Sequence, residues 1–199
     1  MSAEREEAEA EIRRRWDTDD WAGAATEALR VYGPEVLGFL YASLGNQADA
    51  RDAFSALSES MWRSLRGFRW HCSFRTWAYA LARSAIGRIA RDPARRGRMI
   101  RLSDAPEVFE EAERVRTHTQ PHLRSEARSH VRRLRMALSP DDQALLTLRI
   151  DRGLAWRDIA IVMAGDTLSE AELGQKAALF RKRFERLKDR LKTLVTDYA

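Results

Sequence analysis

The 199-residue sequence has few of the features that mark secreted or membrane proteins. Its one cysteine, Cys72, cannot form an internal disulfide, and this favours a reducing cytoplasm. Apolar runs stop at about ten residues, well short of the roughly 20 that a membrane-spanning helix needs. The first residues, MSAEREEAEAE, are acidic and lack the apolar stretch of a signal peptide. We therefore expect a cytoplasmic protein with no membrane insertion.

The sequence also lacks the residue patterns of an active site. It has no nucleophile–base set and no phosphate-cradling glycine loop. His71 adjoins Cys72, but the other histidines (His118, His122 and His130) do not follow metal-ligand spacing. These observations predict a protein that is not an enzyme and that holds no metal or cofactor.

Alternating apolar–polar runs of strand type are absent, and the pattern predicts helix almost throughout. Gly33-Pro34 is expected to end one helix and start the next, which closes at Gly45. The sequence leaves three interpretations of the acidic N-terminus open. It is a frayed tail, a helix with Trp16 and Trp21 docked on the domain, or a shield for basic surfaces. Further helices are expected at 48–65, 74–91, 125–138, 140–152, 156–163 and 169–195.

Residues 92–123 contain three of the five prolines and little apolar periodicity, which is typical of a linker. The sequence therefore predicts an all-α protein of two small helical domains, residues 1–91 and 124–199, joined by a flexible linker.

Charge is strongly segregated along the chain. Residues 1–65 carry 13 acidic and seven basic side chains, whereas residues 66–101 carry ten basic and one acidic. A second basic segment lies at the C-terminus, beyond an acidic one. Two basic segments separated by acidic ones suggest two anchorage points on a polyanion such as nucleic acid.

The first basic segment combines arginines with aromatic rings in FRWHCSFRTWAYALARSAIGRIARDPARRGR. On a helical wheel Phe74, Trp77 and Leu81 face the core, while Thr76, Arg83, Gly87 and Arg91 face the other way and can follow phosphates. The loop Arg66–Ser73 places Trp70 and His71 off that stripe, so we expect it to capture an unstacked base. In the alternative interpretation the Trp70 ring folds back on the core.

The second basic segment is a helix that follows a shorter one, as in a helix-turn-helix. An apolar stripe runs from Leu173 to Leu194, and the opposite face can enter a major groove. The alternative is a bundle or coiled-coil helix with an ordinary solvated face.

Three segments resemble the extracytoplasmic-function (ECF) sigma factors of bacterial RNA polymerase. RVYGPEVLGFLYASLGNQADARDAF is similar to the start of region 2, and GFRWHCSFRTWAYALARSAIGRIAR to its promoter-melting part. LSPDDQALLTLRIDRGLAWRDIAIVMAG and FRKRFERLKDRLKTL are similar to region 4. The resemblance implies a protein that binds core RNA polymerase, recognises the −35 and −10 promoter elements and starts promoter melting. The implied partners are core polymerase, promoter DNA as duplex and as unpaired non-template strand, and an anti-sigma factor.

Three residue sets follow from the resemblance and the charge pattern. The −10 and melting set is Arg66, Arg69, Trp70, His71, Arg75, Thr76, Arg83 and Arg91. The −35 set is Gln175, Lys176, Ala178, Arg181, Lys182 and Arg186. The core-polymerase set is Asp49, Asp52, Glu59 and Arg63.

Region 2.2 departs from the family pattern, because Ser55 and Ala56 stand where an acidic or amide pair is usual. This departure favours weaker polymerase binding and keeps two other functions open. One is a helix-turn-helix DNA-binding regulator, and the other is a sigma-like interaction protein; neither would recruit polymerase.

Overall fold

The computed structural model describes residues 3–92, 138–165 and 167–197. Its first half is a helical bundle of α1 (Ala3–Asp17), α2 (Trp21–Leu44), α3 (Gln47–Ser64) and α4 (Phe74–Arg91). A short turn, η1 (Leu65–Gly67), leads from α3 into the loop before α4. No strand occurs within the described ranges, so the all-α prediction is confirmed there. The domain boundary and the helix predicted at 125–138 fall almost entirely outside these residues.

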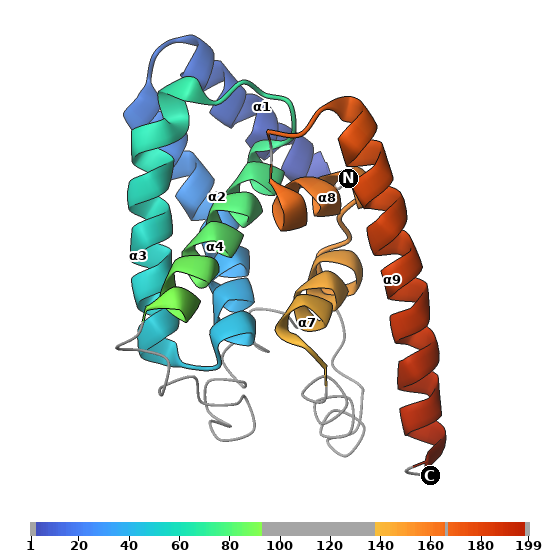
Figure 1. Cartoon of the computed structure of the whole chain (residues 1–199). Coiled ribbons are helices and arrows are strands. Elements are labelled where there is room, and N and C mark those ends of the chain that lie inside the picture. The colour runs from blue at the N-terminus through green and yellow to red at the C-terminus, as the bar shows by residue number, and fades with distance from the viewer. Residues whose placement is uncertain (1–2, 93–137, 166, 198–199) are drawn as a thin grey trace.

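The second half contains α7 (Pro140–Leu146), the π-helical turn η3 (Thr147–Asp151), α8 (Trp156–Ala164) and α9 (Glu170–Asp197). Figure 1 shows α9 along the edge of the molecule, with α7 and α8 between it and the bundle. Helix α8 packs on α4, and α7 also contacts α2. The buried side chains of both halves consequently form one contiguous cluster.

Helix starts follow the sequence signals closely. Asn46, Ser73 and Ser139 cap α3, α4 and α7 with side-chain oxygens that accept backbone N–H bonds. Before α9, the Ser169 hydroxyl and the Glu172 carboxylate form the predicted capping box. These caps satisfy N–H groups that have no partner inside their own helices.

The predicted break at Gly33-Pro34 is wrong, because α2 runs without interruption from Trp21 to Leu44. Pro34 removes one helical N–H donor, but burial along the helix outweighs that loss. Gly33 faces Phe54 of α3, and a Cβ on it would lie 3.5 Å from that ring. That distance is an ordinary van der Waals contact, so the packing of α2 on α3 does not require a glycine here.

Candidate nucleic-acid interface

The loop between α3 and α4 is anchored by its aromatic side chains. Phe68 is buried, and its ring stacks on Trp77 of α4 with centroids 4.7 Å apart and an interplanar angle of 25°. Phe68 also meets Phe74 edge-on at 5.5 Å. Arg66, Arg69 and His71 remain exposed on the outer side of this loop. The loop is thus a rigid apolar support that presents polar and cationic side chains to solvent.

Trp70 does not project from the loop as the base-capture prediction required. Its ring folds back on the core, with centroids 4.9 Å from Phe68 and 6.0 Å from Trp16. The guanidinium of Arg13 covers it at 4.7 Å from the ring centroid, and the indole Nε1 is buried. The backbone at Trp70 is left-handed, with φ at 55°, which is uncommon for a residue other than glycine. Trp70 therefore packs on the core, as the alternative interpretation of this residue expected.

Helix α1 holds this loop in place, which corresponds to the docked-helix alternative for the N-terminus. Trp16 Nε1 donates to the Leu65 carbonyl at 3.0 Å, and its ring meets Trp21 edge-on at 5.5 Å. Ile12 of α1 is fully buried. The four-residue spacing of Ala8, Ile12 and Trp16 is the sequence signal for this docking.

Glu9 of α1 is a structural residue that sequence reasoning missed. Its carboxylate accepts the backbone N–H groups of Phe74 and Arg75 at 2.8 and 2.9 Å. It also accepts the Tyr32 hydroxyl at 2.8 Å. A carboxylate is well placed at a helix N-terminus, where unpaired N–H groups carry partial positive charge. Glu9 therefore ties α1 to the first turn of α4.

Two predicted phosphate contacts on α4 lie in the interior instead, and this corrects the expected orientation of the helix. Arg75 and Thr76 are only 9% and 2% exposed. Arg75 forms a two-bond ion pair with Glu35 of α2, at 2.6 and 3.0 Å, and donates to the Arg152 carbonyl at 3.0 Å. Thr76 was expected on the outward face, but α8 packs against α4, and the predicted core face also missed the buried Tyr79 and Ile86.

The electrostatics at this buried face follow from its packing. Burial opposes the charge on Arg75, but the bond to Glu35 outweighs it and the pKa of Arg75 is raised. Burial also raises the pKa of the Asp158 carboxyl on α8, although hydrogen bonding to Thr76 opposes that rise. Tyr79 is fully buried beside this cluster, and burial raises the pKa of its phenol. The face is therefore a mostly buried polar layer between α4 and α8.

The remaining α4 candidates differ in accessibility. Arg91 is exposed at the end of the helix. Arg83 is half-buried and forms an ion pair with Asp141 of α7. Arg91 is therefore open to solvent, whereas the second half of the chain engages Arg83.

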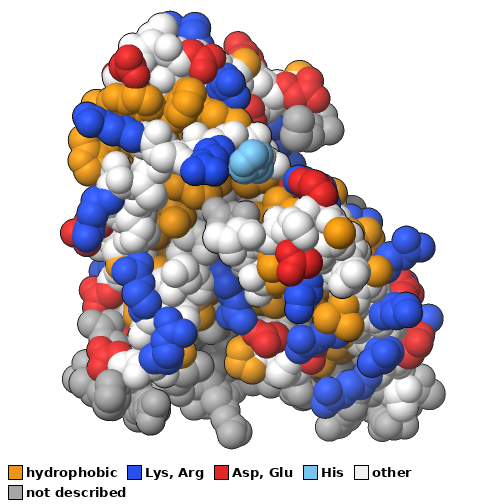
Figure 2. Space-filling view, turned by 45° about the horizontal axis from the view of Figure 1, so that its top comes forward, with side chains coloured by type: hydrophobic (Ala, Val, Ile, Leu, Met, Phe, Trp, Pro, Cys, Tyr) orange, Lys and Arg blue, Asp and Glu red, His pale blue; other side chains and the backbone are white. Residues whose placement is uncertain are grey.

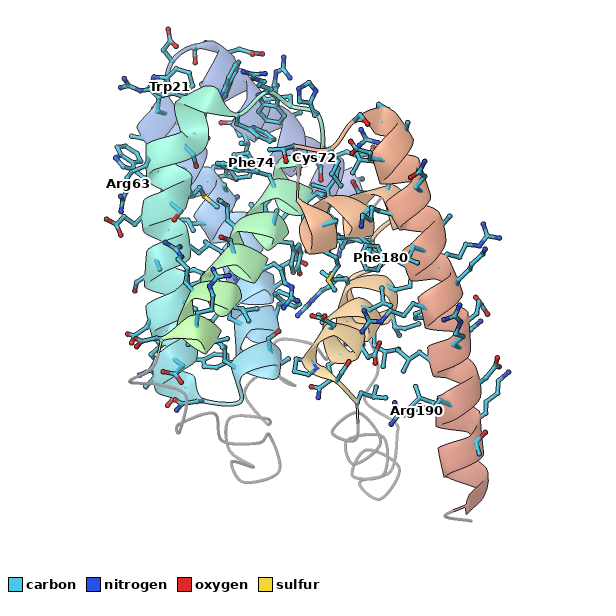
Figure 3. The ribbon with its side chains drawn as sticks, in the orientation of Figure 1. Trp21, Arg63, Cys72, Phe74, Phe180 and Arg190 are labelled. Carbon is cyan, nitrogen blue, oxygen red and sulfur yellow. The ribbon has the colours of Figure 1, made fainter. Side chains whose placement is uncertain are left out.

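Helix α9 has the predicted two faces. Leu173, Phe180, Phe184 and Leu187 are buried against α7 and α8, and Figure 3 shows Phe180 directed toward them. The opposite face is exposed and carries every residue of the −35 set, namely Gln175, Lys176, Ala178, Arg181, Lys182 and Arg186. Figure 2 shows Lys and Arg side chains gathered along the outer part of the molecule that α9 forms.

The core-polymerase candidates lie on α3, and one of them is misplaced. Asp49 is 4% exposed in the first turn of the helix, next to the fully buried Ala50, so its predicted surface position is wrong. Asp52, Glu59 and Arg63 are exposed, and Glu59 pairs with Arg63. Arg63 points away from the bundle in Figure 3.

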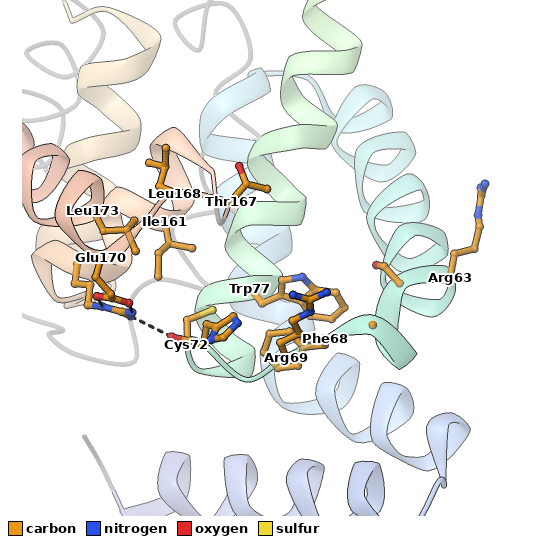
Figure 4. A pocket seen from close by; sticks show the side chains of 14 residues that line it. Arg63, Phe68, Arg69, Cys72, Trp77, Ile161, Thr167, Leu168, Glu170 and Leu173 are labelled. Carbon is orange, nitrogen blue, oxygen red and sulfur yellow. Dashed lines mark hydrogen bonds and ion pairs between the residues drawn. The ribbon is translucent and has the colours of Figure 1, made fainter.

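A cavity of about 790 Å³ opens where the loop meets the second half. Phe68 and Trp77 line one wall, and Ile161 and Leu173 line the other, as Figure 4 shows. Its lining also includes Arg63, Arg69, His71 and Arg157, together with the Glu170 carboxylate, which pairs with Arg157. The size is in the usual range for ligand pockets, and apolar walls with a few polar groups are typical of such pockets.

Residues 29–96 match the family model of sigma-70 region 2. The matched segment spans most of α2, with α3, the loop and α4, so all the −10 and polymerase candidates fall inside it. The match supports membership of the sigma-70 family. None of the curated proteins matches the chain.

The described residues offer no metal centre and no membrane span. Within them, no group of three or more His, Cys, Asp or Glu side chains is placed to hold a metal ion. None of the described helices is long and apolar enough to cross a membrane.

Proposed function

We propose that this chain is an ECF-type sigma factor that directs core RNA polymerase to a set of promoters. The observation that carries the proposal is the region 2 match over residues 29–96 in a chain that also presents a separate basic helix, α9. Region 2 accounts for polymerase binding and the −10 element, and α9 provides a second contact at the −35 element. In this role the chain acts in the cytoplasm and needs no catalytic chemistry of its own.

The −10 contact is assigned to the outer side of the loop and the end of α4. Arg66, Arg69 and His71 are exposed on the loop, next to the apolar support of Phe68 and Trp77, and Arg91 is exposed at the far end of α4. Stacking a base on a ring contributes about 1–3 kcal/mol, and flipping a base out costs about a few kcal/mol. Cation–phosphate contacts must therefore supply the remaining free energy. Arginines around a rigid loop can provide these phosphate contacts.

The −35 contact is assigned to the exposed face of α9. Replacing Arg181 or Lys182 by alanine should weaken binding to an upstream promoter duplex, because each removes one cation from that face. The slope of log affinity against log salt concentration should fall by about 1 for each phosphate that is no longer neutralised. The measurement is fluorescence anisotropy over a salt series. Arg190→Ala, also exposed but nearer the end of α9, is the control; an unchanged slope in the first two variants would count against this face.

The polymerase contact is assigned to α3, through Asp52, Glu59 and Arg63. The deciding experiment is co-purification with core RNA polymerase, followed by run-off transcription from genomic fragments and sequencing of the transcript starts. We expect transcripts only when the chain is added. A DNA-binding regulator would bind promoter fragments but not core polymerase. A sigma-like interaction protein would yield no transcript from any fragment, and that result would refute the proposal.

A further inference from the structure

Helix α9 carries a large apolar side chain on its exposed face. The apolar stripe of this helix is buried, whereas Leu179 is 54% exposed. Leu179 is not in the −35 set, but it lies within the stretch of α9 that this set covers. We propose that Leu179 contacts the methyl group of a thymine in the major groove and so makes the −35 contact selective for an A·T base pair at that position. This inference rests on the proposed function, because it concerns the −35 contact of α9.

The nearest neighbour of Leu179 on this face suits base recognition. Gln175 lies four residues before Leu179 in the same helix, so the two side chains are adjacent, one turn apart. Both are exposed. In the major groove a glutamine amide can bond twice to adenine, and the thymine methyl group accepts apolar contacts. Gln175 and Leu179 together therefore match the edges that A·T base pairs present in that groove.

Cationic side chains flank these two residues. Successive residues of an α-helix turn by about 100°, which places Lys176 on one side of Gln175 and Leu179 and Arg181 on the other. Lys182 lies one turn beyond Leu179, and all three cations are exposed. Phosphate contacts position a protein on DNA, and contacts to base edges specify the sequence. The face has cations at its edges and an amide with an apolar group at its centre, which fits that division.

The acidic side chains of α9 do not oppose DNA at this place. At the start of the helix Glu170 pairs with Arg157, and Glu172 forms the capping box with Ser169. No acidic residue occurs between Glu172 and Glu185. A carboxylate facing a phosphate would repel it, so a stretch without one favours docking on a polyanion. The exposed leucine thus lies within the part of α9 that is best suited to approach DNA.

A contact with a methyl group has a defined size and a specific chemical probe. Packing Leu179 against the methyl removes apolar surface of both groups from water. Burial of one such group corresponds to a change of about fourfold in affinity. Deoxyuridine lacks this methyl group but pairs with adenine as thymidine does. Replacing one thymidine by deoxyuridine therefore removes the apolar contact and leaves every hydrogen bond of the base pair in place.

The test uses DNA duplexes that the full-length chain selects from a random pool. Each thymidine of a selected duplex is replaced in turn by deoxyuridine, and fluorescence anisotropy measures the affinity for both duplexes. For the wild-type chain we expect at least one position where the replacement weakens binding about fourfold. Leu179→Ala should bind the two duplexes equally, because its side chain does not reach the methyl group. Alanine favours helix, so circular dichroism should show an unchanged helix content.

Three further variants make the result specific. Leu179→Met keeps an apolar side chain of similar volume and should retain most of the preference for thymidine over deoxyuridine. Arg181→Ala removes a phosphate contact and should weaken binding to both duplexes by the same factor. Trp62→Ala removes a side chain that is 56% exposed on α3, at the opposite edge of the molecule from α9 in Figure 1, and should change neither affinity.

The outcomes separate this inference from the proposed function. The same response to deoxyuridine in the wild-type chain and in Leu179→Ala would overturn the role of Leu179 and leave duplex binding by α9 intact. Failure of the wild-type chain to select any duplex would overturn both this inference and the −35 assignment. Co-purification with core polymerase tests the sigma-factor proposal independently, because that experiment needs no −35 DNA.

Discussion

Replacing Arg75 by alanine should lower the free energy of unfolding by about 3–5 kcal/mol, because it leaves the Glu35 carboxylate largely buried without its partner. The side chains of this pair are only 11% and 16% exposed, and two hydrogen bonds join them. The variant also lacks the bond to the Arg152 carbonyl and the cation–π interaction with the Tyr79 ring, 5.5 Å away. For a chain of this length the melting temperature should fall by about 10 °C.

Two control variants make this prediction specific. Arg75→Met with Glu35→Leu removes both charges and should recover most of the stability, because a buried pair can be replaced by apolar residues at little cost. Arg63→Ala breaks the exposed pair with Glu59, whose side chains are 67% and 65% exposed, and should cost less than about 1 kcal/mol. Urea unfolding followed by circular dichroism measures all three. A loss below about 1 kcal/mol for Arg75→Ala would return that residue to the DNA-contact set.

The amphipathic pattern predicted much of the fold correctly. Leu173, Phe180 and Phe184 recur at helical spacing, and all three are buried. The caps at Ser139 and Ser169 are also where short-range signals placed them. These features were predictable because a helix stripe and a cap depend on residues within a few positions of each other.

The errors share a different physical cause, which is contact between residues far apart in the sequence. Arg75 and Thr76 lie on the polar side of α4, but α8 from the other half of the chain covers that side. Trp70 lies in a loop that α1 closes from the N-terminus through Trp16. A periodicity argument shows which residues share a face, but it does not identify the element that packs against that face.

Replacing Glu9 should have the second large effect on stability, because its carboxylate accepts hydrogen bonds from three donors. Glu9→Ala would leave the Phe74 and Arg75 amides and the buried Tyr32 hydroxyl without their acceptor. Each hydrogen bond to a charged group contributes about 1.5–3 kcal/mol, and bonds that share one acceptor add incompletely. We therefore expect a loss of about 2–4 kcal/mol in the free energy of unfolding, measured by urea titration.

A local readout distinguishes undocking of α1 from general destabilisation. Without Glu9, α1 should separate from α4, and Trp16 should leave the ring of Trp70, 6.0 Å away by centroid. Tryptophan fluorescence should then shift to the red at urea concentrations below the main transition, and protease should cut within α1 first. Exposed Glu7→Ala on the same helix should leave both signals unchanged. A single unfolding transition, with α1 protected from protease throughout, would contradict this prediction. It would show that Trp16 and Ile12 hold α1 in place without Glu9. It would also show that the N-terminus of α4 needs only its Ser73 cap.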